Sequence, residues 1–272
     1  MRRKLLILTM AVAMVLLTVA TASGITHGEL DGEDHPYVGL MVADDADGNP
    51  MWRCSGTLIS PRIYLTAGHC TFGAAGATIW FESDVEGDLD GLGYPFGGAT
   101  SVDGTPYTHP QYDEDAFFLF DLGVVVLDEP MFMAEYGQLP DLDQLDALKK
   151  RRGRQDTTFT SVGYGLQRIN PVFIEQERVR MVANPHLIQI NTPGFTGDYS
   201  ILLSNNHSTG GTCFGDSGGP NFLGTSNVIA GVTSFAINGN CAGTGGVYRV
   251  DRADDLEWLE EVFGVAGNGN GD

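Results

Sequence analysis

The chain has 272 residues, of which 42% are hydrophobic, and its 35 acidic residues outnumber its 15 basic ones to give a formal net charge of −20. This length and apolar content suit one large all-β domain or two small ones rather than a disordered chain. The acidic balance argues against nucleic acid as a partner, because phosphate binding needs a basic surface, and against docking to an anionic membrane.

The N-terminus has the composition of a secretory signal peptide. Arg2, Arg3 and Lys4 precede an uncharged run over residues 5–20, and small residues follow up to Gly24. The run of about 16 residues is shorter than the roughly 20 that span a bilayer. We expect residues 1–24 to be removed and the mature protein to be secreted, with no membrane association. A signal-anchored membrane protein is the alternative if the run stays uncleaved.

Short apolar runs bounded by Gly, Pro, Asn and Asp recur after residue 24 and predict β-strands. They lie at 37–42, 56–59, 78–81, 122–127, 158–162, 228–233 and 246–250. This pattern favours a barrel or sandwich over βαβ units. A polar helix is predicted at 141–150, close to a subdomain boundary expected near 135–155. An amphipathic helix is predicted at 254–263, and the Gly/Asn-rich residues 264–272 are expected to be disordered.

The segment Gly215-Asp216-Ser217-Gly218-Gly219-Pro220 predicts a nucleophilic serine. Such a serine needs an exposed hydroxyl and backbone N–H groups directed at the developing oxyanion. The surrounding glycines permit the backbone conformation and the close substrate approach that this chemistry requires. A Gly-rich turn without function is the alternative, but six consecutive residues fit the catalytic pattern.

Two further segments supply candidates for a base and its partner. His69, in Leu65-Thr66-Ala67-Gly68-His69-Cys70, has a side chain whose pKa suits proton transfer near neutral pH. Asp121 leads directly into the apolar run 122–127, where a buried charge would need a partner. The competing acids are Asp113, Glu114, Asp115 and Asp128, none of which directly enters that run.

These motifs, in this order and spacing, resemble those of the trypsin/chymotrypsin family of serine endopeptidases. The resemblance extends from Ile25 to about Phe263 and includes residues 109–112, 163–165, 234–236 and 246–248. It implies an all-β fold of two six-stranded antiparallel β-barrels with the active site between them, plus a C-terminal helix. The peptidase domain would span 25–263. The family needs no cofactor, acts on protein or peptide substrates, and suggests a monomer.

The resemblance also implies roles for individual residues. Ser217 would be the nucleophile, His69 the base and Asp121 its orienting carboxylate, with the N–H groups of Gly215 and Ser217 forming the oxyanion hole. Gly211 would form the floor of the specificity pocket and Ala236 and Gly246 its walls, beside Ser234 and Phe235 in the substrate-pairing strand. Because this lining carries no charge, we expect an apolar residue, rather than Arg or Lys, before the scissile bond.

The four cysteines allow three pairings, and their count does not choose among them. The resemblance implies Cys54–Cys70 and Cys213–Cys241. It also implies that a freed Ile25 amino group pairs with Asp216, so signal cleavage after Gly24 would itself activate the enzyme. No Cys-x-x-Cys pair is present, and no metal site is expected.

Some positions depart from the family pattern. Gly68 replaces alanine, Phe235 tryptophan and Ala236 glycine, while the start reads Ile25-Thr26-His27-Gly28 instead of Ile-Val-Gly-Gly. None of these changes removes a catalytic group.

Two other sequence features and one alternative function belong to this prediction. The acids at alternate positions over 82–90 are read as a solvated loop rather than a calcium site, and His109 is read as structural. The alternative function is a catalytically silent binding protein on the same fold.

Overall fold

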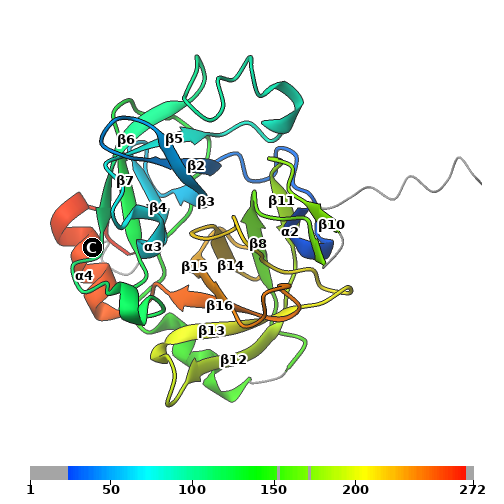
Figure 1. The fold of residues 1–272 in the computed structure, drawn as a ribbon. Helices are drawn as coiled ribbons and strands as arrows, with labels where there is room; N and C mark the ends of the chain where they lie inside the picture. The colour runs from blue at the N-terminus through cyan, green and yellow to red at the C-terminus, as the bar shows by residue number, and fades with distance from the viewer. Residues whose placement is uncertain (1–23, 152–153, 171–172, 268–272) are drawn as a thin grey trace, which may run out of the picture.

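The structure is a computed structural model that describes residues 24–151, 154–170 and 173–267. The predicted signal peptide therefore lies outside the described residues, apart from Gly24. Within the described ranges, no helix is long and apolar enough to cross a bilayer. The chain forms a mostly β structure with a short C-terminal helix, which confirms the predicted fold class (Figure 1).

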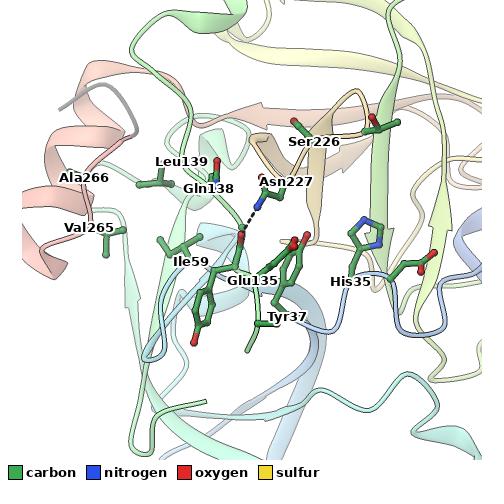
Figure 2. Close-up of a pocket in the computed structure, with 15 residues that line it drawn as sticks. His35, Tyr37, Ile59, Glu135, Gln138, Leu139, Ser226, Asn227, Val265 and Ala266 are labelled. Carbon is green, nitrogen blue, oxygen red and sulfur yellow. Dashed lines mark hydrogen bonds between the residues drawn. The ribbon is translucent and has the colours of Figure 1, made fainter. Parts of the chain in front are cut away.

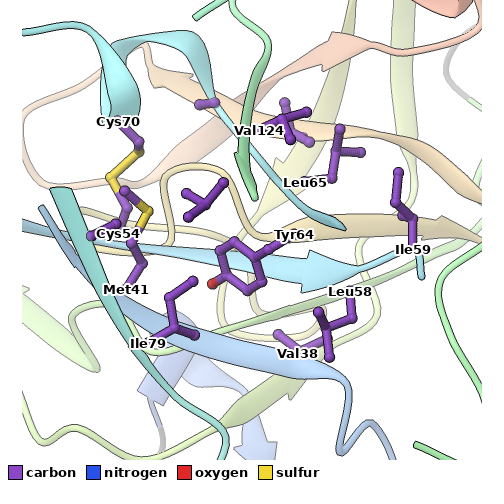
Figure 3. Close-up of a cluster of buried hydrophobic side chains, with 14 of the residues drawn as sticks. Val38, Met41, Cys54, Leu58, Ile59, Tyr64, Leu65, Cys70, Ile79 and Val124 are labelled. Atoms are coloured by element: carbon purple, nitrogen blue, oxygen red, sulfur yellow. A yellow bond between two sulfur atoms is a disulfide. The ribbon is translucent and has the colours of Figure 1, made fainter. Parts of the chain in front are cut away.

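The first half of the chain closes into a six-stranded antiparallel barrel in the order β2-β3-β4-β7-β6-β5. Its strands are β2 (Val38–Asp44), β3 (Pro50–Leu58), β4 (Ile63–Thr66), β5 (Gly76–Trp80), β6 (Val102–Thr108) and β7 (Gly123–Leu127). Apolar side chains from these strands fill the interior around Tyr64, whose hydroxyl donates to the carbonyl of Gly39 at 2.7 Å (Figure 3). Gly56 is needed here, because a Cβ atom at this position would lie 2.5 Å from the Tyr64 ring.

The second half forms a sheet in the order β1-β11-β8-β14-β15-β16-β13-β12. Its strands are β1 (Glu29–Leu30), β8 (Phe159–Gly163), β11 (Met181–Ala183), β12 (Leu187–Thr192), β13 (Gly197–Asn205), β14 (Pro220–Leu223), β15 (Ile229–Ala236) and β16 (Gly243–Arg249). A separate hairpin contains β9 (Arg168–Asn170) and β10 (Phe173–Glu175).

The second sheet curls into a barrel because β11 and β12 are parts of one interrupted segment. β11 pairs with β8, whereas β12 pairs with β13 at the other edge of the sheet. The bridge between Thr158 and His186 joins the two edges at the interruption. Counted in this way, residues 181–192 act as one strand of a six-stranded ring, and β1 is an added edge strand.

The two barrels are joined by residues 128–158, which contain the 3₁₀ helix η3 (Gln144–Lys150) where a longer polar helix was predicted. The C-terminal helix α4 (Ala253–Phe263) packs against the first barrel (Figure 1), where Phe263 contacts the Tyr107 ring. The first residues of the predicted disordered tail are placed against the body, with Val265 N donating to Leu259 O at 3.3 Å. Residues 268–272 lie outside the described part of the chain.

Candidate active site

Strand pairing in the first barrel brings His69 next to Asp121. Thr66, at the end of β4, pairs with Gly123, at the start of β7. His69 lies just after β4 on the single-turn helix α3 (Gly68–Thr71), and Asp121 lies just before β7. Gly68 fits tightly between them, since a Cβ atom there would come within 3.0 Å of Leu122 N. This crowding gives a local reason for glycine at that position.

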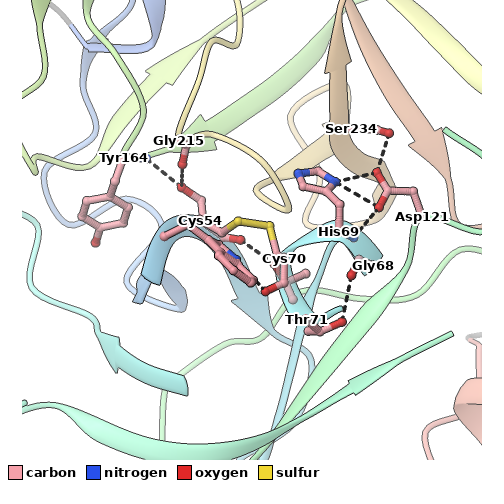
Figure 4. Close-up of a disulfide and its surroundings, with 12 residues drawn as sticks. Cys54, Gly68, His69, Cys70, Thr71, Asp121, Tyr164, Gly215 and Ser234 are labelled. Atoms are coloured by element: carbon pink, nitrogen blue, oxygen red, sulfur yellow. Dashed lines mark hydrogen bonds and ion pairs between the residues drawn. A yellow bond between two sulfur atoms is a disulfide. The ribbon is translucent and has the colours of Figure 1, made fainter. Parts of the chain in front are cut away.

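Asp121 is fully buried and accepts hydrogen bonds from three groups (Figure 4). His69 N donates at 2.8 Å, His69 Nδ1 lies 2.9 Å from Oδ2, and Ser234 Oγ donates to Oδ2 at 2.5 Å. The competing acids Asp113, Glu114, Asp115 and Asp128 are all exposed. Of these acids, Asp121 is therefore the one that orients the imidazole ring.

The environment of His69 favours its protonated form. Burial alone would lower the pKa of His69, but the charge of Asp121 and its hydrogen bond outweigh this effect, and the pKa is raised above its ordinary value. The outer part of the ring remains accessible, since the side chain is 26% exposed. His69 can thus exchange a proton with a group in the adjoining pocket.

Ser217 and His69 line the same pocket, a hollow of about 330 Å³ between the two barrels. The other lining residues are uncharged: Phe117, Thr212, Cys213, Phe214, Thr233, Ser234, Phe235 and Ala236. Gly218 N donates to Thr233 O at 2.8 Å, which fixes the Ser217 loop to β15. Within the described part of the chain, no hydrogen bond joins Ser217 Oγ to His69.

The backbone around Ser217 has a shape that only glycine adopts easily. Gly215 has φ +94° and Gly218 has φ +78°. In the described residues, neither Gly215 N nor Ser217 N donates to a protein acceptor. Both donors are thus free for a ligand.

Ser55, which the sequence analysis missed, lies under this loop and is fully buried. Its Oγ donates to Gly215 O at 2.9 Å and accepts from Tyr164 N at 2.9 Å (Figure 4). Its own N–H donates to Ser217 O at 2.7 Å. Ser55 therefore holds both residues of the predicted oxyanion hole. Its position after Cys54 was the only available signal, and that signal does not indicate this contact.

Asp216 points away from the pocket and is fully buried. Its carboxylate accepts hydrogen bonds from Gly165 N at 2.7 Å and Cys213 N at 2.8 Å. Burial raises the pKa of Asp216 to about 7, although these hydrogen bonds oppose the shift. Ile25 is also fully buried, packed near Met181 and still joined to Gly24, and no ion pair links it to Asp216 in the described chain.

Only some of the residues predicted to form the specificity pocket lie together in the structure. Ser234, Phe235 and Ala236 line the hollow beside Ser217, whereas Gly211 and Gly246 are not part of this lining. A Cβ atom on Gly211 would meet the side chain of Asn205 at 2.5 Å, and one on Gly246 would lie 2.3 Å from the Phe235 ring. Both glycines therefore make room for neighbouring side chains.

Two disulfides stabilise the segments that carry the site. Cys54–Cys70 joins β3 to α3 next to His69 (Figure 4). Cys213–Cys241 joins the segment before Ser217 to the one before β16. These are the pairs that the family resemblance implies. Although Cys54 and Cys70 lie close to His69, their sulfurs are bonded to each other and offer no thiolate to a metal.

The other regions noted in the sequence lie outside the site. In the acidic run, Glu86 forms an ion pair with Arg178 at 2.8 Å. His109 is buried between the rings of Phe120 and Trp258. A larger hollow of about 820 Å³, near His35 and Asn227, contains none of the three candidate catalytic residues (Figure 2).

The chain is similar in sequence and in fold to several known proteins. A family model described as Trypsin matches residues 30–256. The chain is 23% identical to a collagenase of Hypoderma lineatum, covering 85% of this chain and 83% of that protein. It is 28% identical to a trypsin of Saccharopolyspora erythraea, covering 79% and 88% respectively. The solved structure of HL collagenase has the same fold, with a TM-score of 0.68 at 19% identity, over 88% of this chain and 99% of the other.

Proposed function

The chain belongs to the trypsin family of serine endopeptidases, and we propose that it hydrolyses peptide bonds with Ser217, His69 and Asp121 as its catalytic triad. The observation that carries the proposal is the fully buried Asp121 carboxylate, which holds His69 Nδ1 at 2.9 Å beside the pocket that Ser217 lines. Because Nδ1 is bound to Asp121, Nε2 of the imidazole is left to exchange a proton with a group in the pocket.

The reaction follows from these positions. Ser217 Oγ attacks the scissile carbonyl carbon while His69 Nε2 accepts the hydroxyl proton. The proton then passes to the leaving amine, and an acyl-enzyme remains on Ser217. Water, deprotonated by His69, releases the acid product. Asp121 stabilises the imidazolium that forms in each half of the cycle.

The oxyanion is stabilised in this proposal by the N–H groups of Gly215 and Ser217. Support comes from the fact that neither donor is used by a protein acceptor in the described chain. Removing one such donor typically costs about 3–4 kcal/mol of transition-state stabilisation.

The pocket also supports a preference for apolar side chains before the scissile bond. Apart from His69, its lining carries no ionisable group, and it includes the aromatic rings of Phe117, Phe214 and Phe235. An Arg or Lys side chain placed there would lose its hydration without gaining a carboxylate, whereas an apolar one gains about 25 cal/mol per Å² buried.

We further propose that the mature enzyme is secreted and that signal cleavage after Gly24 activates it. The new amino group of Ile25 would move to the carboxylate of Asp216, which has no cationic partner within ion-pair distance in the described residues. A buried carboxylate of this kind gains strongly from a nearby cation.

A catalytically silent binding protein is the second candidate. It is favoured by one observation, the missing hydrogen bond between Ser217 and His69 in the described chain. A solved inactivated protease paralogue of the scabies mite also shares the fold, with a TM-score of 0.65 at 17% identity. In an active enzyme the hydrogen bond between Ser217 and His69 would form when substrate binds, because catalytic hydrogen bonds are often long in the free enzyme.

A set of peptide substrates that differ only in the residue before the scissile bond tests the proposal. We expect the purified protein to cleave Phe, Tyr, Leu or Met substrates with kcat/KM at least tenfold above the Arg and Lys substrates. Ser217→Ala should remove activity on all of them. Preferred cleavage after Arg or Lys would refute the pocket assignment, and no cleavage of any substrate would favour the silent binding protein.

A further inference from the structure

Two histidines that lie 180 residues apart in sequence meet on the surface of the second barrel. His27 Nδ1 and His207 Nδ1 are 3.2 Å apart, and the two rings have centroids 4.8 Å apart at an interplanar angle of 82°. Both side chains are exposed, so their rings can turn without displacing core residues. A pocket of about 290 Å³ that they help to line lies at the same place.

The distance between the two nitrogens matches the separation of two ligand atoms bound to one metal ion. Zinc bonds imidazole nitrogen at about 2.0–2.1 Å in tetrahedral geometry, which places two bound nitrogens roughly 3.3 Å apart. Imidazole nitrogen is also a ligand that zinc, copper and nickel accept readily. A small rotation of each ring would direct both lone pairs at one ion instead of at each other.

The charges around the pair have mixed effects. Arg168, a cation on the pocket wall, opposes a second cation. The chain as a whole attracts cations, since it carries a net charge of −20.

We propose that His27 and His207 form a two-histidine binding site for a divalent transition-metal ion such as Zn²⁺, with the remaining ligand positions open to water. Two protein ligands make this a reversible site, unlike the closed four-ligand sites of structural zinc. The proposal does not depend on the chain being an active peptidase.

The ligands belong to segments that are already tied to the candidate site. Thr26, next to His27, donates through Oγ1 to Asn205 Oδ1 at 2.7 Å, and its carbonyl accepts from Gly211 N at 3.1 Å. Asn205 in turn donates through Nδ2 to Thr212 O at 2.8 Å, and Thr212 lines the pocket beside Ser217. A metal that joins His27 to His207 would therefore restrain the N-terminal segment and the strand end that lead into this pocket.

His27 also holds an unusual backbone conformation. Its φ is +60° and that of Ile25 is +43°, both in a region that residues other than glycine seldom occupy. Such strain persists only where the surroundings maintain it. A metal bond through His27 would add one such restraint.

Calorimetric titration of the purified, chelator-stripped protein with ZnCl₂ tests the site. We expect one Zn²⁺ per chain, with affinity reduced at least tenfold in His27→Asn and in His207→Asn. His186→Asn is the matched control, because His186 contacts Ser204 instead and should leave binding unchanged. Circular dichroism establishes that each variant is folded, and having two ligand variants keeps the test valid if one fails to fold.

Hydrogen exchange supplies a readout that is independent of activity. With Zn²⁺ present, amides in 26–30 and 204–213 should exchange at least threefold more slowly in the wild-type protein and the His186→Asn control, but not in either ligand variant. Zinc binding of undiminished affinity in both ligand variants would place the ion elsewhere, for example at His69, and overturn the proposal. Absence of any zinc binding to the wild-type protein would overturn it as well.

Discussion

At the scale of single residues, the candidate site depends on how one buried carboxylate is compensated. Asp121 has no solvent contact, and its charge is balanced by the ring of His69 together with the N–H of His69 and the hydroxyl of Ser234. Hydrogen bonds to a charged group contribute about 1.5–3 kcal/mol each. Loss of any one donor should therefore disturb the orientation and basicity of the imidazole.

The hydroxyl of Ser234 gives the most specific test of this balance. We expect Ser234→Ala to lower kcat/KM roughly tenfold, because Asp121 loses its donor at 2.5 Å and the hydroxyl has no replacement in the buried site. The measurement is the rate on the best apolar substrate. Ser226→Ala, which removes a hydroxyl bonded to Leu223 O far from the pocket, is the control. Equal rates for the two variants would contradict a role for Ser234 in orienting Asp121.

The raised pKa of His69 predicts the acid limb of the pH profile. Catalysis needs neutral His69, so kcat/KM falls as pH falls through the pKa of the free enzyme. Asp121 stabilises the protonated ring, which places that pKa above the ordinary value of 6.5. A profile of kcat/KM between pH 5 and pH 9 on an uncharged substrate measures it. A half-maximal point well below pH 6.5 would conflict with this account.

At the scale of elements, the site rests on the loop that leads from Ser217 into β14. A Cβ atom on Gly218 would lie 2.0 Å from Thr66 Oγ1 and 2.5 Å from Ser55 O, so the loop is packed directly against the first barrel. Gly224, on the other side of β14, also has a positive φ, but nothing lies within 4 Å of its Cβ position. Alanine substitutions at Gly218 and Gly224 therefore separate the destabilisation caused by backbone strain from that caused by a steric clash.

We therefore expect Gly218→Ala to destabilise the protein by about 2 kcal/mol or more beyond Gly224→Ala, because both variants carry backbone strain and only the first also forces atoms apart. Thermal and chemical unfolding of both variants provide the comparison. Gly218→Ala should also lose most activity, since Ser217 precedes it directly. Similar stability of the two alanine variants would mean that the loop is not held as tightly as described.

Elements were predicted better from the sequence than contacts between elements. The runs at 122–127 and 228–233 contain β7 and most of β15, because strands that are buried along most of their length leave a continuous apolar run in the local sequence. The polar segment at 141–150 is instead the 3₁₀ helix η3, held in part by Leu145 N donating to Asp251 Oδ2, a contact 106 residues away. Such a tertiary contact leaves no mark in the local sequence.

The same limit applied to the site. His69, Asp121 and Ser217 could be predicted as candidates because their motifs are local, whereas Ser55 was missed because its contact with Gly215 spans 160 residues. The contact between His27 and His207 could not be predicted for the same reason, because it joins distant segments. No metal site was expected from the sequence, whereas this contact leads us to propose one. Ser234 was assigned to substrate binding, but its hydroxyl also contacts Asp121.

At the scale of the whole molecule, the proposed pairing of Ile25 with Asp216 would couple chain cleavage to stability. In the uncleaved chain its pKa is about 7, well above the usual value near 3.8, so the folded state binds a proton more tightly than the unfolded state does. Stability therefore falls as pH rises from about 4 to about 7, by up to about 1.4 kcal/mol per pH unit. An Ile25 amino group paired with Asp216 would remove this loss of stability at higher pH.

We expect the chain that retains Gly24 to lose stability over this pH range, and Asp216→Asn to flatten the dependence. Protein that begins at Ile25 should show a weaker fall or none, since the new cation holds the carboxylate in its charged form. Denaturant unfolding between pH 4 and pH 8 gives the comparison. The same steep fall in both forms of the chain would argue against pairing of Ile25 with Asp216.

If Ser217 is an activated nucleophile, it should react covalently with reagents that label active serine hydrolases. The folded protein should react with a fluorophosphonate at neutral pH to give a single adduct, located on Ser217 by peptide mass spectrometry. Ser217→Ala should give no adduct, and His69→Ala should slow labelling by at least about 10³-fold, because the hydroxyl then lacks its base. If the folded wild-type protein took up no label, or if labelling of the His69→Ala variant were as fast as that of the wild type, the triad assignment would be wrong.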